Sequence, residues 1–179
     1  MSNFFDRTFS VLSELLLKLL PASLREKDAF SYYLAGLKAQ SKGDYAKAMD
    51  NYLESLYKED DSFDRSYLYL NIGIIFNKVG YTKLAIKYCI EATRANESMA
   101  RAYYTIGSIY QYRSYVIMYK APDWQKSEYS EAFSDKANEF FILAVKYGPE
   151  DYIWLRHWLI CSDIAEEDEE GNLKKTKLK

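Results

Sequence analysis

Three glycines recur at nearly the same interval along the 179-residue chain. Gly36, Gly73 and Gly107 are separated by steps of 37 and 34 residues, and a tyrosine lies four residues before each of them. An alanine follows the first two glycines by twelve residues, at Ala48 and Ala85. A period near 34 residues with small side chains at fixed offsets is typical of stacked helix pairs, because small residues let two helices approach closely.

The second half of the third unit appears 18 residues later than this period predicts. Four residues carry it with the expected mutual spacing: Ala137, Phe141, Ala144 and Pro149. We therefore predict an all-α tetratricopeptide-repeat superhelix of three helix pairs, at residues 29–62, 66–99 and 100–149. The excess lies within the third pair. With a turn at Ala121-Pro122, it predicts two elongated helices and a hairpin that projects beyond the others.

Two flanking segments accompany the repeats. Residues 1–28 are predicted to form an amphipathic helix and a linker, with apolar residues at helical spacing: Phe5, Phe9, Leu12, Leu16 and Leu19. This helix could dock on the first repeat or lie in a membrane interface. Residues 150–165 are predicted to form a C-terminal capping helix that covers the last repeat with its apolar side, which carries Tyr152, Leu155, Trp158 and Leu159. The charged residues 166–179 are expected to be a disordered, solvated tail.

Composition excludes several classes of protein. The net charge is −2, which disfavours a nucleic-acid binder. The two cysteines form no CxxC pair, so neither a zinc site nor a disulfide framework is expected. His157 is the only histidine, and the chain has no Gly-rich phosphate loop. We therefore expect no catalytic residues, metal, cofactor or small-molecule substrate. We also expect no secretory signal, transit peptide or membrane-spanning segment.

Protein binding is then the expected role, and two groups of residues are candidates for it. In tetratricopeptide arrays the first helix of each pair lines a concave groove. The residues at groove positions here are mostly apolar or aromatic: Phe30, Tyr33, Leu37, Tyr67, Leu70, Ile74, Arg101 and Tyr104. Such a groove suits an amphipathic helix or an extended apolar segment of a client. Alternatively, several of these rings pack between repeats.

The tip of the long third hairpin forms the second group. It carries four aromatic residues that could form a partner-binding arm: Tyr112, Tyr115, Tyr119 and Trp124. Tyrosine and tryptophan are enriched at binding hot spots. The competing interpretation is that these rings pack on one another and hold the arm together.

Three stretches of sequence resemble one family, the plastid- and cyanobacterium-encoded tetratricopeptide proteins for photosystem I assembly. The stretches are FFDRTFSVLSELLLKLLP, EKDAFSYYLAGLKAQSKGDYAKAMDNYLES and DRSYLYLNIGIIF, and the closing PEDYIWLRHWL is also similar. The resemblance implies a non-enzymatic assembly factor that binds newly made reaction-centre and peripheral subunits and other assembly factors. It implies a plastid location, peripheral on the stromal face of the thylakoid membrane. The alternative is a generic tetratricopeptide adaptor or a co-chaperone for another complex.

Overall fold

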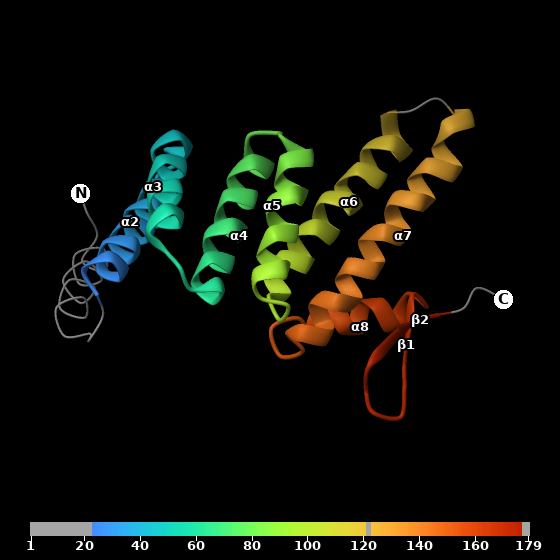
Figure 1. Cartoon of the computed structure of the whole chain (residues 1–179). Coiled ribbons are helices and arrows are strands. Elements are labelled where there is room, and N and C mark those ends of the chain that lie inside the picture. The colour runs from blue at the N-terminus through green and yellow to red at the C-terminus, as the bar shows by residue number, and fades with distance from the viewer. Residues whose placement is uncertain (1–22, 121–122, 177–179) are drawn as a thin grey trace. The chain divides into compact units, whose positions relative to one another are not determined.

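The computed structural model describes residues 23–120 and 123–176, which form seven helices and two short strands. The elements are α2 (Leu24–Ser41), α3 (Tyr45–Lys58), α4 (Ser62–Lys78), α5 (Thr82–Ala95), α6 (Ala100–Lys120), α7 (Asp123–Tyr147), α8 (Ile153–Cys161), β1 (Ala165–Glu167) and β2 (Leu173–Lys175) (Figure 1). The predicted all-α fold of three helix pairs is confirmed. The chain divides into two compact units between Asp60 and Asp61. The predicted helix at residues 4–20 lies outside the described residues.

The first unit is the pair α2/α3, which closes around a glycine. A Cβ atom placed on Gly36 would lie 2.5 Å from the Tyr52 ring, so no larger residue fits without a shift. Tyr52 is completely buried, and its hydroxyl donates to Gln40 Oε1 at 2.7 Å. Satisfying this hydroxyl removes the cost of burying it. The glycine and the tyrosine are therefore complementary halves of one contact.

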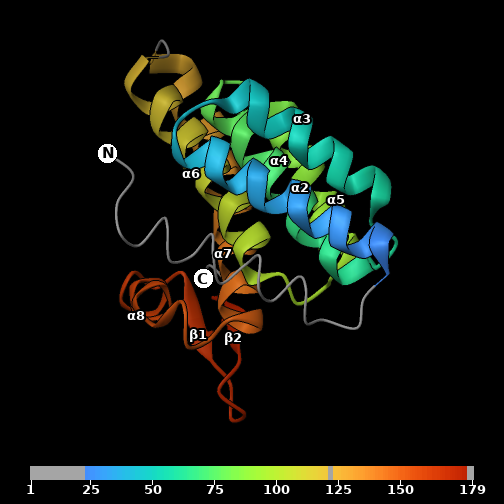
Figure 2. The same cartoon turned by 90° about the vertical axis from the view of Figure 1, so that its left-hand side faces the viewer.

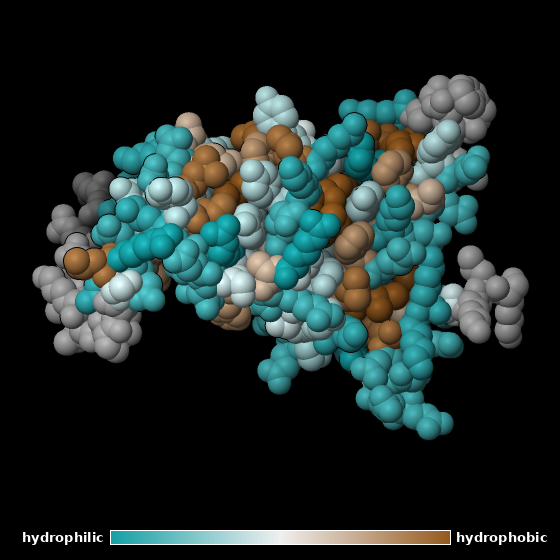
Figure 3. All heavy atoms as spheres, viewed as in Figure 1, coloured by the Kyte–Doolittle hydropathy of each residue, from teal (hydrophilic) through white to brown (hydrophobic). Residues whose placement is uncertain are grey.

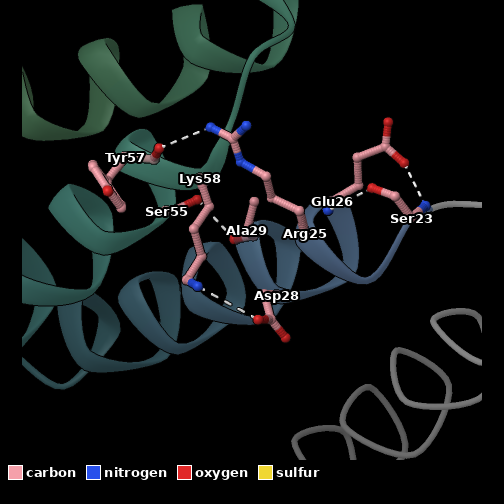
Figure 4. A network of polar contacts seen from close by, with 8 residues as sticks. All are labelled: Ser23, Arg25, Glu26, Asp28, Ala29, Ser55, Tyr57 and Lys58. Carbon is pink, nitrogen blue, oxygen red and sulfur yellow. Dashed lines mark hydrogen bonds and ion pairs between the residues drawn. The ribbon is translucent and has the colours of Figure 1, made fainter.

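Polar contacts fix how α2 begins and how it meets α3 (Figure 4). Ser23 caps α2: its hydroxyl accepts from the Glu26 amide, while the Glu26 carboxylate accepts from the Ser23 amide. This reciprocal pair is a capping box, which satisfies two amides that the first helical turn leaves open. Within the interface, the buried Ser55 hydroxyl donates to the Ala29 carbonyl at 2.7 Å. These bonds set the start of α2 and its height against α3.

The second unit repeats the same packing rule twice. A Cβ atom on Gly73 of α4 would lie 2.8 Å from Cys89 Sγ of α5, and one on Gly107 of α6 would lie 2.6 Å from the Phe141 ring of α7. A core joins α4, α5 and α6 through buried residues: Leu70, Cys89, Ala92, Met99, Ala102 and Ile106. Cys89 takes the place that Tyr52 holds in the first unit, and a sulfur atom fills the space there.

The α6/α7 pair is elongated, as predicted. Helix α6 continues 13 residues past Gly107, whereas α4 continues only 5 past Gly73. The added length has its own packing. The buried Ser114 hydroxyl donates to the Ser130 carbonyl at 2.8 Å, and the Tyr110 ring stacks near the ring of Phe133 on α7 at 6.0 Å. Within the described residues, the extra length of the sequence therefore forms paired helix.

Helix α8 closes the last pair. Its Leu155 and Leu159 are buried in a core with Phe141, Ala144 and Val145 of α7. The helix spans nine residues, fewer than the predicted segment 150–165, because Ser162 caps its end and the chain turns at Asp163, whose φ is +54°. The chain then returns along α7 as an antiparallel hairpin, in which β1 pairs with β2 from Ala165↔Lys175 to Glu167↔Leu173 (Figure 2).

This hairpin corrects the prediction of a disordered tail over residues 166–179, as far as residue 176. Opposite charges hold it: Arg156 of α8 donates to Glu167 Oε1 at 2.9 Å and to the Gly171 carbonyl at 2.7 Å. Asp168 pairs with Lys174 at 3.0 Å. The acidic and basic runs therefore face each other across a turn, and hydrophilic residues cover its tip (Figure 3).

Within residues 23–120 and 123–176, no helix combines the length and the apolar character that a membrane crossing requires.

Candidate functional site

The predicted groove residues of α2 differ in how far they are exposed to solvent. Phe30 is exposed, whereas Tyr33 and Leu37 are half-buried. The Tyr33 ring lies 6.3 Å from the Phe30 ring and 6.1 Å from the ring of the buried Tyr52. Tyr33 therefore helps to hold the helix pair, and Phe30 presents the more open ring.

The groove residues of α4 differ sharply in exposure. Tyr67 is exposed and meets the Phe63 ring edge to face, with centroids 5.4 Å apart. Ile74 is half-buried, but Leu70 is only 2% exposed. Leu70 belongs to the core against which α6 packs, so the prediction that it lines an open groove is wrong. The physical reason is that α6 covers this turn of α4 with Ala102 and Ile106.

On α6, Arg101 is exposed and Tyr104 is half-buried. Tyr104 lies within an aromatic cluster to which α7 and the segment that follows it both contribute. Its ring stacks on Tyr152 at 5.1 Å, lies 5.7 Å from Phe141, and meets Trp154 edge to face at 6.0 Å. Tyr104 therefore links the groove side of α6 to the C-terminal helix.

The arm tyrosines are open to solvent. Tyr112, Tyr115 and Tyr119 are each more than half exposed. Tyr115 and Tyr119 contact each other, with ring centroids 4.4 Å apart, but this contact leaves most of both side chains accessible. Among the arm residues whose side chains are described, mutual packing therefore accounts for one pair. The fourth predicted member, Trp124, has a side chain outside the described part of the structure.

The two predicted sites meet on one face of α6. Successive members of the set Arg101, Tyr104, Ser108, Tyr112, Tyr115 and Tyr119 are three or four residues apart on an unbroken helix. This spacing places all six on the same side of an α-helix. We call this surface the α6 face. It runs for about 27 Å at a rise of ~1.5 Å per residue, so groove and arm form one continuous surface in the second unit.

Sequence reasoning missed a second aromatic surface, on α8. Trp154 is 58% exposed, and Trp158 and Ile153 are also exposed. The amphipathic pattern predicted that Trp158 would face the repeats together with Leu155 and Leu159. The leucines do, but a helix of nine residues has one buried side, and the two indoles fall beside it. The sequence carries two adjacent apolar i, i+4 pairs, Trp154/Trp158 and Leu155/Leu159, and the pattern alone does not show which pair is the more buried.

Electrostatic effects mark packing contacts within the second unit. Burial raises the pKa of the Cys89 thiol to about 12, so Cys89 stays protonated. The hydrogen bond that the Tyr147 hydroxyl donates to Glu97 Oε1, at 2.7 Å, raises the Tyr147 pKa to about 12. The backbone amide of Asn172 and the nearby Lys174 hold the Asp168 pKa below its ordinary range. All three groups serve the structure.

Comparison with known proteins gives the relationship of the whole chain. It is 40% identical over 166 residues to the photosystem I assembly protein Ycf3 of Rippkaea orientalis, covering 93% of this chain and 94% of the relative. The chain belongs to the Ycf3 family. Other Ycf3 proteins, from Cuscuta obtusiflora and Acaryochloris marina, are 38% and 36% identical over 157 residues, covering 88% of this chain and 91% and 92% of theirs. The resemblance noted in the sequence is thereby confirmed. No protein-family model matches the chain.

Proposed function

We propose that this Ycf3-family protein is a photosystem I assembly factor, a chaperone-like scaffold that binds newly made photosystem I subunits and promotes their joining. The observation that carries the proposal is the similarity to photosystem I assembly proteins along about nine-tenths of both chains. Subunits of such a complex bury apolar surface against one another, and before assembly that surface promotes aggregation. A binding protein that shields it would favour productive assembly.

The α6 face is the proposed client-binding surface. It presents three largely exposed tyrosines in a row, Tyr112, Tyr115 and Tyr119. Tyrosine offers a large apolar area together with a hydroxyl, and loses little conformational freedom on binding. The remaining groove residues that keep accessible surface are proposed to add secondary contacts: Phe30, Tyr33, Leu37, Tyr67 and Ile74. Leu70 is excluded because it is buried.

The proposed role is non-enzymatic. His157 is exposed on the surface of α8, and the Cys89 thiol is buried and protonated. A nucleophile needs an accessible, activated group, which Cys89 is not. Binding and release of a polypeptide requires only complementary surface, which the α6 face supplies.

We further propose that the protein works on the stromal face of the thylakoid membrane, in a plastid, as a peripheral protein together with other assembly factors. Photosystem I is a membrane complex, so a factor for its assembly must reach that membrane. The apolar residues at helical spacing in the segment 4–20, such as Leu12 and Leu16, support either a membrane contact or docking on α2/α3. Leu12→Asp with Leu16→Asp separates these outcomes: release from isolated membranes with an unchanged melting temperature supports contact with lipid.

The experiment that tests the proposed surface is affinity purification from solubilised thylakoids with a triple variant, Tyr112→Ala/Tyr115→Ala/Tyr119→Ala. We expect recovery of photosystem I subunits to fall by about tenfold or more, which corresponds to about 1.4 kcal/mol of binding free energy. The matched control is Tyr57→Ala on α3, which removes a tyrosine that is 81% exposed but lies outside the α6 face.

Two results would contradict these proposals separately. Full recovery of photosystem I subunits by the triple variant would remove the α6 face from consideration but leave the assembly role intact. Normal accumulation of photosystem I in cells that lack this chain would overturn the assembly role itself.

A further inference from the structure

The outward side of α8 is largely apolar where a terminal helix is ordinarily polar. Stacked helical repeats remain soluble because the helix that caps the array turns a polar side to water. Here that side carries Ile153, Trp154 and Trp158, all exposed, with His157 as their polar neighbour. We call these three residues the α8 platform. Exposed indoles grouped on one terminal helix are typical of a surface that a partner covers.

The platform is held rigidly from beneath. Trp154 meets the Tyr104 ring edge to face at 6.0 Å and 83°, and Trp158 meets the Phe141 ring in the same way at 6.3 Å and 88°. Phe141 is itself buried in the core of the α6/α7 pair. Rings already fixed by such contacts lose little conformational entropy when a partner arrives, so more of their contact energy goes into affinity.

A positive charge lies at the edge of this aromatic surface. Arg101 is one turn before Tyr104 on α6, and it lies close enough to Tyr152 for its charge to oppose the rise of the Tyr152 pKa that burial causes. Arg101 is exposed, and among the described residues it makes no ion pair. Asp151 acts on Tyr152 in the opposite sense. A partner that brings its own carboxylate would therefore meet an available guanidinium beside the indoles.

We propose that the α8 platform binds an amphipathic helix of a partner protein, whose apolar side chains lie across Trp154 and Trp158 and whose carboxylate pairs with Arg101. The two indoles are four residues apart, one helical turn, which matches the i, i+4 ridge of apolar side chains on such a helix. The inference deepens the proposed function, on which it rests, by naming the kind of segment that a client presents at this end of the second unit.

The charges nearby favour a protein segment over a lipid surface. Glu150 and Asp151 are exposed just before α8, and the hairpin that follows it exposes Glu166, Glu169 and Glu170. Anionic membranes bind basic surfaces and repel carboxylates. A partner helix can place a single carboxylate at Arg101 and keep its remaining surface neutral or basic, whereas a charged lipid surface cannot make that distinction.

The test uses the full chain and a defined probe, an array of overlapping peptides of about 20 residues that covers the photosystem I core polypeptides. The Trp124→Phe background limits indole fluorescence to the platform, because the chain has three tryptophans. We expect the retained peptides to be amphipathic with an acidic residue beside the apolar side, and to shift the emission to shorter wavelength. Trp154→Ala should weaken them by about tenfold or more.

Reversing the charge of Arg101 distinguishes specific binding at the platform from nonspecific hydrophobic binding. Arg101→Glu should weaken a retained peptide by about tenfold or more, and replacing the acidic residue of that peptide by lysine should restore the affinity. The control Tyr57→Ala should bind as the unmodified chain does. Arg101 is exposed, so its variant tests the proposal even if Trp154→Ala unfolds α8. Two results would overturn the inference: no peptide is retained, or binding does not depend on Arg101 and Trp154.

Other occupants of the platform are outcomes of the same series. Sedimentation with anionic vesicles that requires Trp154, or concentration-dependent self-association that requires it, would overturn the proposal in favour of a membrane or a second copy. Failure of the platform also differs from failure of the assembly role. If the unmodified chain and the Arg101→Glu variant restore photosystem I equally well in cells lacking the gene, the platform inference fails alone. If those cells never lack photosystem I, the proposed function fails.

Discussion

The base of the α6/α7 pair, around Gly107, and its distal half, beyond Tyr110, are held together by different contacts. At the base, Gly107 leaves room for the Phe141 ring, just as Gly36 leaves room for Tyr52 in the first unit. In the distal half, two buried serines meet across the helices, and the tyrosines of α6 point to solvent. The base follows the repeat pattern, whereas the distal half departs from it.

Within this one helix pair, the residues that stabilise the fold are therefore different from the residues that are available for binding. Residues at the base are buried, so replacing them costs packing energy. Residues of the distal half leave large aromatic surfaces accessible, which contributes little to folding but is available to a partner. The comparison predicts that substitutions at the base lower stability, and that substitutions on the distal α6 face lower binding.

The largest expected loss of stability comes from Phe141→Ala at the base. Phe141 is 6% exposed and contacts the rings of Tyr104 and Trp158, so its removal leaves a cavity that costs about 3–5 kcal/mol of unfolding free energy. Urea unfolding followed by circular dichroism measures the loss. Phe133→Ala in the distal half, where the ring is only half-buried, is the comparison. An equal loss for both would erase the distinction.

Gly107→Ala tests the same contact from the opposite helix. The added Cβ would lie 2.6 Å from the Phe141 ring and 3.1 Å from the Ala137 carbonyl, so we expect a loss of about 1–3 kcal/mol from overpacking. Alanine is the better helix former, so a local propensity effect would instead stabilise the protein by about 1 kcal/mol. The sign of the change in melting temperature therefore decides whether close approach is the reason for glycine here.

The buried serines predict a smaller effect with a diagnostic pattern. Ser114→Ala removes a hydroxyl that donates to the Ser130 carbonyl at 2.8 Å, which should cost about 0.5–1.5 kcal/mol. Ser114→Ala/Ser130→Ala removes both hydroxyls and should cost less than twice the single loss. A double-mutant cycle by chemical denaturation measures this coupling. Strictly additive losses would show that the two hydroxyls contribute independently.

Alkaline pH should weaken the base in part through Tyr147. The pKa of Tyr147 is raised from 10.0 to about 12 by its hydrogen bond to Glu97, so the unfolded chain loses this proton before the folded protein does. The contribution is complete below pH 10 and declines as the pH rises toward 12. Tyr147→Phe should remove this part of the pH dependence. An unchanged slope of stability against pH in the variant would show that another group is responsible.

The smallest expected change in stability comes from the distal tyrosines. Each substitution in Tyr112→Ala, Tyr115→Ala and Tyr119→Ala should shift the free energy of unfolding by about 0.5 kcal/mol or less, because the side chains are mostly exposed. Thermal unfolding of the single variants measures this. A loss of several kcal/mol would mean that these rings hold the arm together, which is the competing interpretation from the sequence.

The sequence predicted the helix pairs because their main constraint is local and steric. A glycine that must admit a side chain from the next helix recurs with its partner at a fixed spacing in the first two pairs, and Gly107 keeps this kind of contact with Phe141 although 18 further residues separate the two. The length of α6 and α7 followed from the same spacing. The family was evident from longer stretches of similarity, which the relatives confirm.

The errors arose where distant segments meet. Leu70 has a groove position by spacing, but it is buried because α6 packs over it, which a pattern within α4 cannot reveal. The charged residues after α8 predict a solvated tail, but they form a hairpin. The ion pair between Asp168 and Lys174 depends on a turn between them, and a run of charged residues does not indicate such a turn. The amphipathic pattern predicts Trp158 on the buried side of α8, but the structure buries Leu155 and Leu159 and leaves Trp158 exposed.

The pairing of Ser114 with Ser130 also determines which way the α6 face points. If α6 slid against α7 by one helical turn, the two buried hydroxyls would lose the hydrogen bonds that they now make with each other's residue, which is costly for a buried polar group. Apolar contacts alone tolerate such sliding far better. The two serines therefore fix the register of α6 against α7. Because the register is fixed, the exposed tyrosines of α6 keep one position and one orientation, and a partner always meets the same surface.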